Sequence, residues 1–130
     1  MTGLRFLRRD QRGAAVIEMA IALPVLVLFI WGIFQMGLLF QANAGMQHAL
    51  GEGARYATVW PTPTDIQIKG RISDKVYGVN NGTFTVADPT SSSGFKTLSV
   101  SYSMPMNFLF FQGPTVNVTR SKKVYIAPAV

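Results

Sequence analysis

The sequence predicts a membrane-anchored α+β protein, in which a long amino-terminal helix carries a second short helix and a small antiparallel sheet of about three strands. Three observations indicate this fold class: an apolar run long enough to cross a bilayer, helical periodicity that continues beyond it, and short alternating segments in the carboxyl-terminal half. A chain of 130 residues is long enough for one domain. Once a membrane segment is subtracted, the remaining residues can form only a small hydrophobic core.

The apolar run lies at residues 19–40 and predicts a membrane helix. No ionisable side chain occurs from Met19 to Gln47. About 20 residues at roughly 1.5 Å each span the roughly 30 Å hydrocarbon layer, and a helix satisfies its own backbone there. Pro24 removes one amide donor inside this run, so we expect a kink just before it.

Residues 1–13 form a basic leader. It contains four arginines and one aspartate: Arg5, Arg8, Arg9, Arg12 and Asp10. The positive-inside rule places this leader in the cytoplasm and everything after Phe40 outside. The rest of the net charge of +6 is scattered, without a basic face that carries stacking aromatics, so we expect no nucleic-acid partner.

A secretory signal peptide is the competing interpretation, because the tripeptide Ala42-Asn43-Ala44 follows the apolar run. That run exceeds the apolar core of about 7 to 15 residues that signal peptides have. The apolar pattern also continues across the tripeptide at helical spacing, on one face: Leu39, Met46, Leu50, Gly53, Ala57 and Trp60. We therefore predict one helix over residues 14–60, with its external part at residues 41–60.

Residues 61–130 are predicted to form a small external α+β head. A second helix starts with Thr62 as its cap and Pro63 at its first helical position, and Gly78 ends it. Its apolar positions recur every four residues: Ile68, Ile72 and Val76.

Alternating apolar residues predict three strands at residues 83–87, 97–104 and 115–127, with a flexible polar loop at residues 88–94. The positions expected to face inward are Phe84, Val86, Leu98, Val100, Tyr102, Met104, Val116, Val118, Val124 and Ile126. This face would cover the outer half of the long helix.

The connection at residues 104–114 is unusually apolar for a hairpin loop. It carries Met106, Phe108, Leu109, Phe110 and Phe111. Three interpretations stay open: a lid on the core, a surface that binds a protein partner, or a dip into the outer leaflet beside the membrane helix.

We expect no catalytic function, cofactor, metal or small-molecule substrate. The external carboxylates are spread over separate elements, cysteine is absent, and His48 has no second ligand in its helical register. Glu52 and Arg55, three residues apart on one helix, are expected to form an ion pair.

Glu18 stands at the entry of the apolar run, where a carboxylate costs several kcal/mol unless it is paired. One interpretation places it at the lipid headgroups, solvated or paired with Arg12. Another follows from the spacing of Gly13 and Glu18 after a basic stretch, which is similar to the processing site of type IV pilin-like precursors. Prepilin peptidase cuts such precursors after the glycine.

The wider segment, residues 13–57, resembles the TadE-like family of minor pseudopilins of the tight-adherence (Flp) pilus. The resemblance is carried by Glu18, Leu23-Pro24, Gly32, Gly37 and Glu52-Gly53-Ala54-Arg55-Tyr56-Ala57, whereas Met19 departs from the aromatic residue that often follows the glutamate.

The resemblance implies a structural role in pilus assembly, linked to adhesion and secretion. It implies cleavage between Gly13 and Ala14, a methylated amine on Ala14, pairing of that amine with Glu18 to set subunit register, and a helix loosened at Pro24. The implied partners are prepilin peptidase, other pilins or pseudopilins, the inner-membrane assembly platform and membrane lipid. The implied location is the bacterial inner membrane, with the head in the periplasm or outside the cell.

Two other functions stay open. The chain could be a permanently anchored single-pass envelope protein that binds a partner through residues 104–114, in which case Gly13 has no role. It could also be a major pilin, which would share the processing and differ in abundance.

Overall fold

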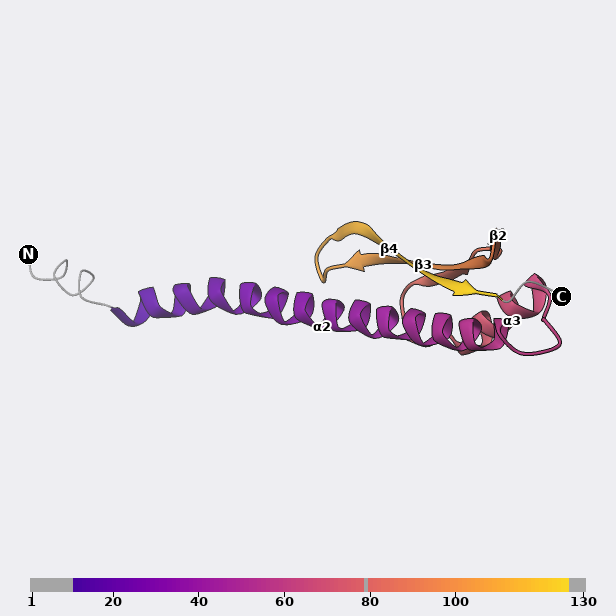
Figure 1. Cartoon of the computed structure of the whole chain (residues 1–130). Coiled ribbons are helices and arrows are strands. Elements are labelled where there is room, and N and C mark those ends of the chain that lie inside the picture. Colours follow the sequence, from indigo (N-terminus) through magenta and orange to yellow (C-terminus); the bar gives the residue numbers. More distant parts are fainter. Residues whose placement is uncertain (1–10, 79, 127–130) are drawn as a thin grey trace, which may run out of the picture.

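The structure is a computed structural model that describes residues 11–78 and 80–126. One long helix, α2 (Gln11–Ala57), forms a rod, and the second helix and the sheet lie along its carboxyl-terminal half (Figure 1). The predicted α+β class is confirmed, with an antiparallel sheet of four strands where about three were predicted. Most of the basic leader, including Arg5, Arg8, Arg9 and Asp10, lies outside the described residues, as does the side chain of Arg12.

Helix α2 has 47 residues and is therefore about 70 Å long. It continues through Pro24, and whether it bends there stays a prediction. Its amino-terminal half is exposed, whereas Ala42, Met46 and Ala49 farther along are fully buried under the head. The same helix is thus apolar on all sides at one end and amphipathic at the other, as the change in sequence pattern predicts.

The end of α2 differs from the prediction. Ala57 is its last residue, and both the amide and the hydroxyl of Thr58 donate to the Arg55 carbonyl, which closes the last turn. Pro61 follows and cannot continue a helix. Trp60 is 84% exposed, so the prediction that it shares the buried face is wrong, while the other positions of that face are buried or half-buried.

The second helix, α3 (Asp65–Lys75), begins later than predicted. Its N-cap is Thr64, not Thr62, and Pro63 precedes the cap instead of occupying the first helical position. The Gln67 amide donates to the Thr64 hydroxyl and the Thr64 amide donates to the Gln67 side-chain oxygen. This capping box satisfies two amides that a helix start would otherwise leave without partners, and it sets the boundary.

The apolar stripe of α3 packs as predicted at its centre. Ile68 and Ile72 are fully buried, and Val76 is half-buried at the C-cap. The helix ends at Lys75, three residues before Gly78.

The sheet is built around one long central strand, β3 (Phe95–Asn107). β4 (Gln112–Tyr125) pairs along its whole length, and β1 (Thr83–Val86) and β2 (Thr90–Ser92) pair with different parts of β3. Since a strand has two edges, β1 and β2 share the edge that β4 does not occupy. All pairings are antiparallel.

The strand β2 corrects the prediction of a flexible loop at residues 88–94. Thr90 to Ser92 pair with Phe95 to Thr97 through a tight turn at Ser93 and Gly94. Gly94 has φ +80°, a conformation that glycine adopts without steric cost. The sequence pattern did not indicate this strand, because its three residues are polar and exposed and show no apolar alternation.

The core lies between one face of the sheet and the two helices. Leu98, Val100, Tyr102 and Met104 of β3 are buried on one face, as their alternation predicts. On β4 only Val124 is buried, and Val116, Val118 and Ile126 after the strand are half-buried. Phe84 and Val86 of β1 are half-buried against the same core.

The apolar connection is shorter than predicted. β3 continues to Asn107 and β4 begins at Gln112, which leaves only Phe108 to Phe111 as the turn. The Phe108 amide donates to the Phe111 carbonyl at 2.9 Å, and the two rings stack with centroids 4.8 Å apart. Extended strands therefore carry this hairpin well beyond the core, toward the amino-terminal half of α2 (Figure 1).

Candidate functional site

The predicted processing site lies at the start of α2. Gly13 and Ala14 are exposed in its first turn, and a side chain added at Gly13 would meet nothing within 4 Å. Glu18 is exposed as well and lies four residues after Ala14. Residues four apart share a helix face about 6 Å apart along the axis. A new amine on Ala14 would therefore lie one turn from the Glu18 carboxylate.

Most side chains of the apolar stretch that follows are exposed. Large side chains such as Ile21, Phe29 and Ile33 are 65%, 69% and 70% exposed. By its length and composition, α2 can cross a membrane, and it fits a single-pass membrane anchor.

The hairpin turn is tied to this apolar stretch through one backbone unit. The Asn107 carbonyl accepts hydrogen bonds from the Trp31 indole, at 2.7 Å, and from the Gln35 side-chain amide. The Asn107 amide donates to the Gln35 side-chain oxygen at 3.1 Å. Gln35 is the one buried polar residue among the described side chains, and both ends of its amide are used by Asn107.

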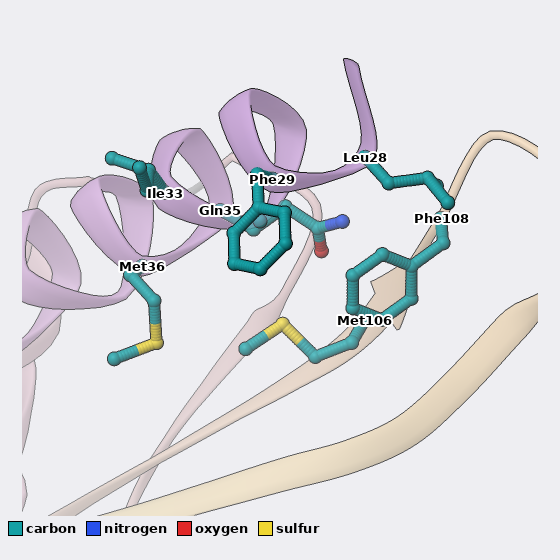
Figure 2. A pocket seen from close by; sticks show the side chains of 8 residues that line it. Leu28, Phe29, Ile33, Gln35, Met36, Met106 and Phe108 are labelled. Atoms are coloured by element: carbon teal, nitrogen blue, oxygen red, sulfur yellow. The ribbon is translucent and has the colours of Figure 1, made fainter. Parts of the chain in front are cut away.

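An apolar groove lies between α2 and the hairpin. Figure 2 shows Leu28, Phe29, Ile33 and Met36 on the helix side, with Met106 and Phe108 facing them from the hairpin. The groove measures about 520 Å³ and is open to the outside. Phe108 also lies against Gly32, where an added side-chain carbon would come within 3.9 Å of its ring.

The five predicted residues of the hairpin thus divide into two groups. Met106 and Phe108 are half-buried and turn toward α2. Leu109, Phe110 and Phe111 are 51%, 73% and 56% exposed. The processing site is not brought near them, because Glu18 precedes Trp31 by 13 residues, or about 20 Å of helix.

Sequence reasoning missed the roles of Trp31, Gln35 and Asn107. A signal was present, because Gln35 is a single amide in an apolar run, and a polar side chain in such a run is expected to bond to another element. The identity of its partner, 72 residues away, could not be read from the sequence.

The charged side chains gather at the opposite end of the head. Glu52 accepts a hydrogen bond from Arg55 at 3.0 Å, which confirms the predicted ion pair, and Arg71 of α3 lies 3.8 Å from the same carboxylate. The hydrogen bond from Arg55 is the main reason that the pKa of the Glu52 carboxyl lies below its ordinary value. His48 is exposed, and its ring centroid lies 5.7 Å from that of Tyr77.

The comparison with known families concerns the helix. Neither a curated protein nor a solved structure matches the chain. The family model described as TadE-like protein matches residues 13–55, a segment that includes both Gly13 and Glu18. Over this segment of α2 the chain is similar to TadE-like proteins, which confirms the resemblance seen in the sequence.

Proposed function

We propose that this chain is a minor pseudopilin that initiates or supports assembly of a tight-adherence pilus after prepilin peptidase cuts between Gly13 and Ala14. The family match over residues 13–55 is the observation that carries the proposal. The role is structural and not catalytic. Its partners are prepilin peptidase, other pilins or pseudopilins and the assembly platform in the bacterial inner membrane.

The charge pairing supplies the mechanism. Glu18 and the amine that cleavage would create at Ala14 lie one helical turn apart on an exposed face. Opposite charges at short distance attract by several kcal/mol in low dielectric, far more than on a wet surface. Cleavage thus gives a carboxylate that is unfavourable at the membrane a partner of opposite charge, on the same subunit or on a neighbour, and so favours joining other subunits.

The topology follows from the leader. Its arginines place the amino terminus in the cytoplasm, so the head lies in the periplasm or beyond. The exposed apolar stretch of α2 is then available both to lipid in the membrane and to other helices in an assembly.

The deciding experiment is amino-terminal sequencing of the protein extracted from membranes of cells with and without prepilin peptidase. We expect a chain that begins at Ala14 only where the peptidase is present. Gly13→Leu should stay uncut and abolish its function in piliation. Gly37→Leu is the matched control, because Gly37 also has open space around it and lies in the same helix. A chain that still begins at Met1 or Thr2 in peptidase-positive cells would refute the proposal.

A second pair of variants separates cleavage from assembly. Glu18→Gln keeps the shape and removes the charge, so we expect normal cleavage and loss of incorporation. Glu52→Gln removes a carboxylate from the other end of the same helix and should leave both steps intact. Equal incorporation of the two variants would show that the Glu18 charge has no role.

The exposed side chains Leu109, Phe110 and Phe111 favour a second candidate, a permanently anchored protein whose head binds an envelope partner. In that case Gly13→Leu leaves function intact and Phe110→Ser removes it. A major pilin, the third candidate, would be the most abundant protein in sheared pili, whereas a minor pseudopilin would be scarce there.

A further inference from the structure

We propose that the tip of the β3–β4 hairpin, residues 108–111, enters the outer leaflet of the membrane that α2 crosses, and that lipid acyl chains occupy the groove between hairpin and helix. The inference rests on the membrane anchoring in the proposed function, and it is independent of cleavage and pilus assembly. Composition alone predicts one membrane contact, the helix α2, and the inference adds a second.

The position of the tip along α2 is the first argument. The hydrogen bonds of Asn107 hold the hairpin at Trp31 and Gln35. After Glu18, the first exposed polar side chain on the helix is Gln41, six residues beyond Gln35, or about 9 Å farther along the axis. The tip therefore lies on the membrane side of the point where the helix surface becomes polar.

The chemistry of the tip is the second argument. Leu109, Phe110 and Phe111 are each more than half exposed, and the apolar side chains of α2 near Trp31, such as Ile30, Ile33 and Phe34, are exposed as well. No ionisable residue other than Tyr102 occurs from Thr97 to Thr119, so charged side chains are kept away from this end of the sheet. The first cation on β4, Arg120, instead donates to Asn43, beyond the polar boundary of the helix.

Backbone bonding sets how deep the tip can go. The Phe108 amide and the backbone amide and carbonyl of Asn107 are bonded within the protein, which suits a low-dielectric surrounding. Leu109 and Phe110 lie in irregular backbone, and lipid-exposed loops do not occur within the hydrocarbon centre. The tip thus enters to the boundary between headgroups and acyl chains, about 5–10 Å deep, as amphipathic elements do.

The groove is the third argument. Its walls are apolar apart from Gln35, whose amide is used by Asn107, and it is open to the outside; Figure 2 shows the side chains that line it. A space of about 520 Å³ with such walls would be costly to fill with water. Because it lies beside the apolar stretch of a membrane helix, acyl chains are the apolar molecules present there at the highest concentration.

The experiment uses the absence of cysteine, since each introduced cysteine is then unique. Phe110→Cys probes the tip. Tyr125→Cys is the matched control, an aromatic residue on the same sheet that is 77% exposed, at the far end of β4. Leu26→Cys, 58% exposed on α2, reports whether the helix crosses the membrane. Each full-length variant is labelled with an environment-sensitive fluorophore and reconstituted in vesicles of phosphatidylethanolamine and phosphatidylglycerol.

Two quenchers then locate each label: iodide in the water, and lipid that carries a spin label near the top of its acyl chain. We expect the label at residue 110 to emit at shorter wavelength than that at residue 125. We also expect it to be quenched several-fold more strongly by the spin-labelled lipid and several-fold less by iodide. All three replaced side chains are exposed, so the core stays intact, and near-ultraviolet circular dichroism checks this.

Three outcomes would overturn the inference. If residue 110 behaves like residue 125 while residue 26 is protected from iodide, the anchor stands and the tip lies in water. If residue 26 is also open to iodide, the membrane crossing itself fails. If residue 110 is shielded from both quenchers, a second copy of the chain covers the tip instead of lipid, and dilution of the protein in the vesicles would restore its exposure.

Discussion

A close backbone approach between α2 and the segment after α3 gives a sharp test of how the head is held on the helix. Gly45 lies buried under the segment after α3, and a side-chain carbon built on it would come within 2.0 Å of the Tyr77 carbonyl oxygen and 3.0 Å of the Tyr77 nitrogen. These neighbours are backbone atoms, so no rotamer change can relieve the contact. Gly45→Ala must therefore push the segment that contains Tyr77 away from the helix.

The magnitude follows from two opposing contributions. Replacing glycine by alanine inside a helix stabilises it by roughly 0.5–1 kcal/mol. Overpacking in a close contact costs about 1–3 kcal/mol, and an approach of 2.0 Å lies at the upper end. We expect Gly45→Ala to destabilise the head by about 2 kcal/mol in net terms.

Gly51→Ala is the matched control, because Gly51 lies in the same helix and a side chain there would meet nothing within 4 Å. It should raise the free energy of unfolding by roughly 0.5–1 kcal/mol. Thermal unfolding in detergent, followed by near-ultraviolet circular dichroism, should thus show midpoint shifts of opposite sign. Two upward shifts would mean that Tyr77 does not pack on Gly45 in the molecule.

Three further predictions concern the core, the hairpin and the charged cluster. Ile72→Ala, at a fully buried position, should lower the free energy of unfolding by about 2–5 kcal/mol. Ile66, on the same helix, is 84% exposed, so Ile66→Ala should change it by less than about 0.5 kcal/mol. Equal losses in the same thermal assay would contradict this packing. Gln35→Leu leaves the Asn107 amide without its acceptor, which costs about 1–3 kcal/mol. Hydrogen exchange at the Asn107 amide should therefore accelerate. Gln47→Leu, at an exposed position of the same helix, should leave that exchange rate unchanged. Because the pKa of Glu52 is lowered in the folded protein, its contribution to stability is fully present above its ordinary value of 4.5 and is lost as the pH falls through the lower folded value. Acidification should therefore lower the unfolding midpoint less in Glu52→Gln than in the unchanged chain, and parallel curves would show that the Arg55 interaction carries no stability.

Elements that depend on local signals were predicted well. The apolar run at residues 19–40 is part of a helix, as predicted. The alternating residues Leu98, Val100 and Tyr102 form the buried face of a strand, also as predicted. Their period and length are properties of contiguous residues, so no partner is needed to recognise them. The start of α3 was predicted incorrectly, because threonine can cap a helix at either Thr62 or Thr64 and only the hydrogen bonds with Gln67 select Thr64.

Elements that depend on pairing were missed or placed incorrectly. Residues 90–92 are polar and exposed and become a strand only because the edge of β3 is free to pair with them. Trp60 fits the helical period, yet the chain turns away before it at Thr58. In each case the competing contact comes from another element or from a turn that the periodic pattern does not contain.

The sequence by itself determined that this chain has one long helix with an apolar stretch, a basic leader and a glutamate four residues after the alanine at the predicted cut. These features reside in neighbouring residues, where spacing alone fixes which side chains share a face. Only the tertiary structure decided that the β3–β4 hairpin reaches back along that helix. Gln35 and Asn107 are 72 positions apart, and hydrogen bonds between such distant residues depend on how the sheet lies on the helix.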